Sequence, residues 1–268
     1  MEQLDNHYTN TPTEKKITLE ICAASVASCI AAEAGGAQRI ELCDNLLEGG
    51  TTPSYGTIAL AREKVKIDLY PIIRPRGGDF LYSEEEFEVM KKDVLLCKQL
   101  GCNGVVIGML TATGRVDKER CKTLVELAWP MGVTFHRAFD MTDDPFRALE
   151  DIIEIGCERI LTSGQRNTAV EGAALLRVLV QKADNRIAIM AGSGVRTHNI
   201  AELVKTTGAL EFHTTAKAFE ESHMTFRNPA VSMGGVPGVP EYGIAVTQAQ
   251  EVLLIRELAQ QALTENIV

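Results

Sequence analysis

Short apolar segments rich in β-branched residues alternate along the chain with longer amphipathic segments. After a polar stretch, eight of the short segments have the length and composition of strands, and most gaps between them are long enough for a helix. The eight segments are residues 18–23, 39–43, 68–73, 104–108, 133–136, 159–162, 186–190 and 210–213. Strands that alternate with helices predict βαβ units and a parallel sheet.

A weak internal repeat favours a closed ring of these units. A Gly followed by Ala or Cys, two further residues and an apolar residue occurs at Gly36, Gly101, Gly156 and Gly208, each time before an even-numbered strand. Glycine suits the left-handed residue that ends a helix, and the small residue after it allows close approach to the sheet. The repeat predicts an α/β fold of the (β/α)8 TIM-barrel type, with a doubly wound open sheet as the alternative.

The barrel is expected to be a single domain over residues 17–268. The length of 268 residues fits a fold that typically takes about 250. Residues 1–16 have the composition of a flexible N-terminal tail, and residues 228–243 are rich in Gly and Pro. Residues 248–263 show helical spacing of apolar positions and predict an extra C-terminal helix. Residues 228–268 therefore form an extension that packs on the barrel or on a second subunit.

Charge and cysteine content narrow the classes of partner and compartment. The chain has 27 basic and 36 acidic residues and no basic cluster, which argues against nucleic acid and anionic membranes as partners. No window approaches the ~18 apolar residues of a membrane span, and the polar start has no signal-peptide pattern. We therefore expect a cytoplasmic protein whose seven cysteines are free thiols.

Polar residues inside the strands are predicted to face the barrel interior, because helices cover the outer face and side chains alternate along a strand. This rule places Leu19, Ile21, Ile40 and Leu42 outside. It places Glu20, Cys22, Glu41, Cys43, Ile72, Arg74, Thr134, His136, Glu211 and His213 inside. The active site of this fold lies at the C-terminal rim of the strands, where these side chains would converge. A register error of one residue would reverse the assignment.

Cys22 and Cys43 form the sharpest pair in this set. They end two strands expected to be neighbours about 4.8 Å apart, so both sulfurs could bind one ion. Soft thiolates favour Cu(I), and ring closure would bring His213 within range. Buried cysteine also fills cores, and both interpretations remain open here. Packing is the expected role of the other five cysteines, which are Cys29, Cys97, Cys102, Cys121 and Cys157.

The segment PRGGDF after the third strand is a candidate anion-binding loop. Arg74 and Arg76 carry forked guanidinium groups that suit carboxylate or phosphate, and the glycines allow backbone N–H groups to approach an anion. Alternatively, the two arginines neutralise Glu20 and Glu41 in the mouth.

Two further strand ends carry candidate chemistry. Gly192, Ser193 and Gly194 follow the seventh strand, where barrels often bind phosphate, although a tight turn would need the same glycines. His136 follows the fifth strand with Asp140 nearby, and this pair could perform acid–base work or form a structural hydrogen bond.

These motifs together resemble the copper homeostasis protein CutC family. The matching stretches are LEICAAS, GGAQRIELCDNLLEGGTTPSYG, PIIRPRGGDFLYS, GVTFHRAFDM, RILTSGQ, MAGSGVR and EFHTTAK, followed by FRN and VSMGG. The resemblance covers about residues 19–235. It implies a (β/α)8 barrel, a cytoplasmic location, self-association as a dimer or tetramer, and Cu(I) ligation by Cys22 and Cys43.

The family name describes a phenotype. The predicted mouth contains more charged and polar side chains than a Cu(I) carrier requires. The first hypothesis is a copper homeostasis protein that binds Cu(I) through two thiolates. The alternative is a barrel enzyme of lyase or isomerase type acting on a small anionic or phosphorylated metabolite. In that enzyme His136, Glu20 and Asp140 would be catalytic. Glu41, Arg74, Arg76, Gly192, Ser193, Gly194 and His213 would bind the ligand. A third hypothesis is a scaffold protein with a vestigial rim.

Overall fold

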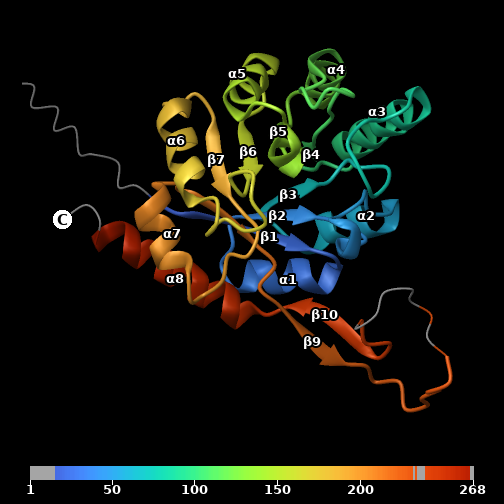
Figure 1. Ribbon diagram of the computed structural model, residues 1–268. Helices are drawn as coiled ribbons and strands as arrows, with labels where there is room; N and C mark the ends of the chain where they lie inside the picture. Colours follow the sequence, from blue (N-terminus) through green and yellow to red (C-terminus); the bar gives the residue numbers. More distant parts are fainter. Residues whose placement is uncertain (1–15, 232, 234–238, 266–268) are drawn as a thin grey trace, which may run out of the picture.

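Eight parallel strands form a ring whose outer face is covered by helices (Figure 1). The structure is a computed structural model that describes residues 16–231, 233 and 239–265. The strands are β1 (Thr18–Ala23), β2 (Arg39–Leu42), β3 (Asp68–Pro71), β4 (Gly104–Ile107), β5 (Gly132–Phe135), β6 (Arg159–Thr162), β7 (Ala188–Ala191) and β8 (Glu211–Thr214). The predicted (β/α)8 barrel is thus confirmed, while nearly all of the predicted tail at 1–16 lies outside the described residues.

The ring closes between β3 and β4. Neighbouring strands pair in the order β3-β2-β1-β8-β7-β6-β5-β4, and β1 pairs with both β2 and β8. Beyond the end of β3, Ile72 bridges Val106, and the Ile73 N–H donates to the Val106 carbonyl at 2.8 Å. This contact joins the two ends of the sheet, so an open doubly wound sheet is excluded.

Helices follow the strands in the alternation that the sequence predicts. They are α1 (Val26–Ala34), α2 (Tyr55–Lys64), α3 (Glu84–Gln99), α4 (Lys118–Ala128), α5 (Pro145–Ile155), α6 (Ala173–Ala183) and α7 (Ile200–Thr207), with short 3-10 helices η1 (Leu46–Glu48) and η2 (Arg137–Met141). The four repeat glycines have φ angles between 71° and 90°, which confirms their helix-ending conformation. Within the described residues, no helix is both long and apolar enough to cross a bilayer.

β1 and β6 have the expected bounds, and the other six strands differ from them by one or two residues. The largest shift is in β7, which begins at Ala188 because the Arg186 N–H donates to the Ala183 carbonyl and closes the turn after α6. Asp184 and Asn185 have positive φ angles in this turn. Ile187, which is buried, therefore belongs to the approach to the strand.

The C-terminal part contains a hairpin that the sequence pattern did not reveal. β9 (Lys217–Glu221) and β10 (Gly243–Thr247) pair antiparallel and project from one side of the barrel (Figure 1). The expected C-terminal helix is present as α8 (Ala249–Glu265), which packs against α1 and α7. The Gly- and Pro-rich segment, residues 228–243, lies partly outside the described residues.

Two apolar clusters lie on opposite faces of the strands. Leu19, Ile21, Ile40 and Leu42 are fully buried in the outer cluster between strands and helices, as the alternation predicts. A smaller inner cluster consists of Cys22, Cys43, Tyr70, Ile72 and Val106, with Leu46 packed against it. The inward register is therefore correct, and it places both thiols inside the barrel.

Candidate functional site

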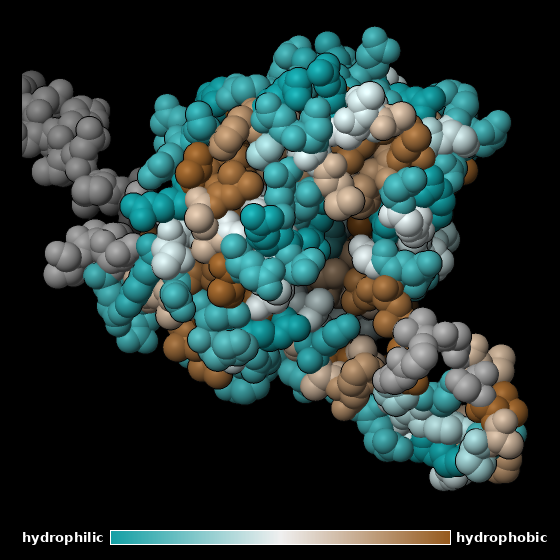
Figure 2. Space-filling model, viewed as in Figure 1, coloured by the Kyte–Doolittle hydropathy of each residue, from teal (hydrophilic) through white to brown (hydrophobic). Residues whose placement is uncertain are grey.

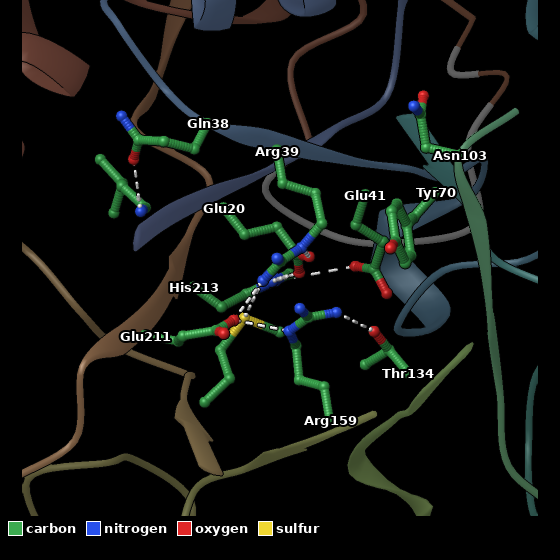
Figure 3. Close-up of polar contacts among 12 residues, drawn as sticks. Glu20, Gln38, Arg39, Glu41, Tyr70, Asn103, Thr134, Arg159, Glu211 and His213 are labelled. Carbon is green, nitrogen blue, oxygen red and sulfur yellow. Dashed lines mark hydrogen bonds and ion pairs between the residues drawn. The ribbon is translucent and has the colours of Figure 1, made fainter. Parts of the chain in front are cut away.

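A layer of paired charges fills the barrel below the mouth (Figure 3). Arg39 pairs with Glu20 and, at 2.5 Å, with Glu211, while Arg159 also pairs with Glu211 at 2.5 Å. Arg159 donates further to the Thr134 hydroxyl at 3.1 Å. Each cation thus has a carboxylate partner in a region with little access to water. This layer forms a rigid floor beneath the mouth.

His213 connects this floor to the thiols above it. Its Nδ1 lies 2.7 Å from Glu20 Oε1, and its Nε2 lies 3.7 Å from Glu41 Oε2. Burial alone would raise the pKa of Glu20, but Arg39 and His213 outweigh it and lower that pKa to about 2. Burial opposes protonation of His213, but hydrogen bonds with Cys22 and Glu20 raise its pKa well above the usual value. Glu20 and His213 therefore form a charged pair.

Cys22 and Cys43 lie side by side at the top of the inner cluster. Their Sγ atoms are 3.6 Å apart, and a Glu41 carboxylate oxygen lies within 4.8 Å of both. The hydrogen bond from Cys43, together with His213, outweighs burial and lowers the pKa of Cys22 to about 5. The same bond raises the pKa of Cys43 well above its usual value. Cys22 is therefore the more readily ionised thiol of the pair.

Strand register brings the two sulfurs together. β1 and β2 pair with Cys22 opposite Glu41, and the Cys43 N–H donates to the Ala23 carbonyl at 2.9 Å just beyond the end of β2. Gly50 approaches from the following loop with a φ of 93°, and a Cβ there would lie 3.3 Å from Cys43 Sγ. A larger residue would press on this sulfur, so the loop encloses Cys43 only because position 50 is glycine.

A cavity of about 460 Å3 opens above the thiol pair at the mouth of the barrel. Its walls are formed by Cys22, Glu41, Leu46, Glu48, Gly49, Ile72, Arg74, Phe80, His136, Arg137, Asp140, Met141, Leu161, Ser193, His213, Thr215 and Lys217. Of the residues singled out from the sequence, Cys22, Glu41, Arg74, His136, Asp140, Ser193 and His213 are in this wall. Glu20, Cys43, Arg76, Gly192 and Gly194 are not in it.

Arg74 and Arg76 have separate surroundings. Arg74 is buried, and its terminal nitrogens donate to the carbonyls of Glu48 and Gly50 at 2.7 Å and of Gly78 at 2.8 Å. Arg76 is partly exposed and pairs with Glu86 at 2.6 Å, near the start of α3. Arg74 thus lies in the cavity wall, whereas Arg76 ties its loop to a helix. Neither contacts Glu20 or Glu41 by hydrogen bond or salt bridge within the described residues.

His136 is buried at the end of β5 in its neutral form. Its Nδ1 accepts a hydrogen bond from the Ala138 N–H at 3.1 Å. Burial, and then the charge of Arg74, lower its pKa to about 3. The ring lies against Gly108, where a Cβ would come within 2.3 Å of it. Because Nδ1 accepts a hydrogen bond, the neutral imidazole carries its single proton on Nε2.

Asp140 does not pair with His136. Its carboxylate accepts from the Thr162 hydroxyl at 2.5 Å, from the Ser163 N–H at 3.0 Å and from the Gln165 N–H at 3.0 Å. It also accepts from Arg137 Nε at 2.8 Å. Asp140 thus fixes the loop after β6 and the position of Arg137 at the rim.

The loop after β7 packs on its neighbour. The Ser193 hydroxyl donates to the Asn167 carbonyl at 2.6 Å, and the Ala169 N–H donates to the Ser193 carbonyl at 2.9 Å. Ser193 and Gly194 have φ angles of 73° and 74°. The hydroxyl of Ser193 is therefore engaged within the protein.

The sequence and the fold both resemble those of known proteins. The sequence model of the CutC family matches residues 17–218. A CutC family protein from Chromobacterium violaceum is 55% identical over 244 residues, which are 91% of this chain and 98% of that protein. The copper homeostasis protein cutC homolog of Mus musculus is 47% identical over 245 residues, covering 91% of this chain and 90% of that one. A crystal structure of CutC from Streptococcus agalactiae superposes with a TM-score of 0.71 at 35% identity, over 74% of this chain and 98% of that one. The range matched by the family contains every residue of the cavity wall.

Proposed function

The chain belongs to the CutC family, and on that premise we propose that it serves copper homeostasis by binding Cu(I) through Cys22 and Cys43. The observation that carries this proposal is the buried thiol pair, with its two Sγ atoms 3.6 Å apart. Copper is the cargo of this site, and the barrel supplies the ligands.

The donor set suits a soft monovalent ion. Two sulfurs bound to one ion at about 2.3 Å, the length of zinc–thiolate bonds, lie at most ~4.6 Å apart, so small movements suffice to bridge them. Thiolates are the ligands that select Cu(I) over harder ions. Binding replaces the hydrogen bond between Cys22 and Cys43 and releases the remaining thiol proton. Glu41 is the one carboxylate close to both sulfurs within the described residues.

The floor beneath the thiols supports this chemistry. His213 hydrogen-bonds Cys22 and is itself held by Glu20 at 2.7 Å. A cation beside the sulfur stabilises the thiolate that a metal requires. Ligand orientation by such outer contacts is typical of metal sites. His213 and Glu20 therefore position Cys22 and need not touch the ion.

We propose a cytoplasmic location, free of nucleic acid and membrane partners, from the acidic composition and the free thiols. All seven cysteines are unpaired and buried. Reduced thiols are typical of the cytosol. A Cu(I) site built from thiols functions only where they remain reduced.

The enzyme alternative is less well supported by the surroundings of its proposed acid–base residues. Glu20 is enclosed by Arg39 and His213, and Asp140 is bonded to the loop after β6. His136, with a pKa of about 3, is a poor base near neutral pH. We therefore favour binding over lyase or isomerase chemistry.

An anaerobic Cu(I) titration against a competing chelator tests the proposal. Because loss of an outer contact alone costs roughly 10–100-fold in metal affinity, Cys22→Ser and Cys43→Ser should each weaken Cu(I) binding by more than about 100-fold. Cys157→Ala removes a buried thiol elsewhere in the core and serves as the matched control, with unchanged affinity expected. Folded Cys22→Ser and Cys43→Ser variants that bind Cu(I) like the wild type would refute the assignment, as would a preference for Zn(II) over Cu(I).

A further inference from the structure

Unpartnered polar atoms gather around the mouth cavity. Among the described residues, four buried side-chain nitrogen or oxygen atoms have no hydrogen-bond partner, and three of them belong to the cavity wall. These three are Arg74 Nε, His136 Nε2 and Thr215 Oγ1. Buried polar groups are almost always paired, so three exceptions in one wall indicate a partner supplied from outside the chain.

Arg74 is a buried cation that has no carboxylate partner. Its terminal nitrogens are used by three carbonyl oxygens, and Phe80 lies under the guanidinium with its ring centre 5.2 Å away. No Asp or Glu in the described part of the chain forms a salt bridge with it. The Tyr82 hydroxyl, the fourth unpartnered atom, lies near Arg74 but carries no charge to balance it. A buried cation without a counter-charge is costly, and an anion bound beside Nε–H would lower that cost.

His136 provides a second donor in the same cavity wall. Since its Nδ1 accepts from the Ala138 N–H, the ring proton lies on Nε2, where no protein acceptor is present. The Phe80 ring lies beside both groups, with its centre 5.1 Å from that of the imidazole and 5.2 Å from the guanidinium carbon of Arg74. A neutral N–H donor beside a cation suits an oxygen that carries negative charge.

The acidic groups in the wall do not fill this role. The Glu48 carboxylate accepts from the Asn45 side chain, and Asp140 is engaged with the loop after β6. Glu41 faces the thiols and His213. All three are therefore used elsewhere in the protein.

We propose that the mouth cavity binds a small organic acid, with its carboxylate accepting hydrogen bonds from Arg74 and His136 and a hydroxyl or carbonyl group at Thr215 Oγ1. The apolar side chains of Ile72, Phe80 and Leu161 line the space in between. Two N–H donors match one carboxylate. The Ser193 hydroxyl is already bonded to the Asn167 carbonyl, so the loop after β7 does not offer this donor to a phosphate. The proposal is independent of Cu(I) binding, because none of the three donors belongs to a thiol ligand.

Isothermal titration calorimetry at pH 7 with lactate, malate and 2-oxoglutarate, and separately with inorganic phosphate, tests this site. At least one carboxylate should bind at millimolar concentration or below. Arg74→Met and His136→Asn should each weaken that binding at least ~10-fold, since each removes a hydrogen bond to a charged group. Asparagine can still accept from the Ala138 N–H but lacks the donor at the Nε2 position. Arg76→Met, outside the cavity, should leave binding unchanged.

Thr215→Val keeps the test decisive if Arg74→Met fails to fold. The Thr215 hydroxyl has no partner in the protein, so valine should leave the free energy of unfolding unchanged or raise it. The same change should weaken carboxylate binding by roughly 5-fold, the usual effect of one hydrogen bond. The proposal is wrong if no carboxylate binds, if phosphate alone binds, or if Thr215→Val and His136→Asn bind like the wild type. A variant lacking both Cys22 and Cys43 should retain carboxylate binding, which separates this outcome from failure of the copper proposal.

Discussion

His136 shows how strongly one residue's surroundings can set its chemistry. At the sequence level it is a histidine near an aspartate at a strand end, a pattern that suits acid–base work. In the structure it lies under Phe80 and against Gly108, with the charge of Arg74 nearby. Burial and that charge keep the imidazole neutral, and Asp140 bonds elsewhere. The residue is therefore a hydrogen-bond donor with a fixed tautomer.

Acid should destabilise the protein through His136. Its pKa is about 3 in the folded state, against 6.5 for an unperturbed imidazole. Between these values the unfolded chain binds a proton that the folded chain excludes, so stability falls as the pH decreases. From pH 7 to pH 5 this residue should lower the free energy of unfolding by about 2 kcal/mol. Urea unfolding of wild type and His136→Asn at both pH values measures the difference.

The exposed His198 provides the control for that measurement. His198→Asn should lose stability between pH 7 and pH 5 to the same extent as the wild type. Equal losses in wild type and His136→Asn would show that His136 is protonated in the folded protein.

Strand alternation predicts which residues of the site face the barrel interior, but it does not predict their hydrogen-bond partners. That rule placed Cys22, Glu41, Arg74, His136 and His213 correctly in the interior. It applies equally to Arg39 and Arg159, which precede Glu41 and Leu161 by two positions and lie in the charged layer below the mouth, although neither is among the predicted site residues. Hydrogen-bond partners depend on side-chain conformations and on loops from distant parts of the chain. The role of Asp140, which is bonded to the loop after β6, could therefore not be read from the sequence.

At the scale of elements, the connection from β2 to α2 shapes the wall of the site. It contains η1 (Leu46–Glu48) and turns back so that Asp44 bridges Thr51. Arg74 bonds to two of its carbonyls, those of Glu48 and Gly50. A loop that holds a buried arginine and covers Cys43 has little freedom to change its path.

Gly50→Ala should therefore destabilise the protein. The φ of 93° is unfavourable for an L residue, and the new Cβ would lie 3.3 Å from Cys43 Sγ. We expect a loss of roughly 1–2 kcal/mol in the free energy of unfolding, measured by urea denaturation.

Gly56→Ala is the matched substitution. Gly56 lies in α2 with open space around its Cα, so alanine should stabilise the protein by up to about 1 kcal/mol. Similar effects of the two substitutions would mean that the loop after β2 tolerates a Cβ at position 50.

The hairpin of β9 and β10 is the element that periodicity could not predict. Lys217–Glu221 is exposed along its whole length, so it lacks the apolar alternation of a half-buried strand. Its pairing with Gly243–Thr247 depends on chain separated from it by a long connection. The eight barrel strands were predictable because burial imposes apolar outer faces on them.

At the scale of the whole molecule, the ring of eight strands closes within one chain, whereas the hairpin contacts the barrel beside α1 and leaves apolar side chains exposed. Phe219 and Ile244 are 60% and 56% exposed, and Figure 2 shows hydrophobic surface on the projecting arm. An isolated two-stranded ribbon is at best marginally stable in water. Apolar groups on such an arm are typical of a surface that packs against another copy.

Self-association through the hairpin should be visible in the mass of the protein. Size-exclusion chromatography with light scattering should give a multiple of the 29.2 kDa chain mass. A double variant, Phe219→Ser with Ile244→Ser, should shift the mass towards a single chain. Trp129→Ser, which changes a side chain 74% exposed elsewhere, should not. A monomeric wild type, or a double variant with unchanged mass, would contradict a hairpin interface.

The shared mouth cavity has a further consequence. Cys22 and Arg74 line the same space of about 460 Å3, so whatever occupies one end alters the water and the electric field at the other. Occupancies that influence one another do so reciprocally, with the same factor in both directions. A barrel with an ion at the thiols and an acid at the arginine would respond to the product of two concentrations. The affinity of such a barrel for the ion would then depend on whether the acid is bound.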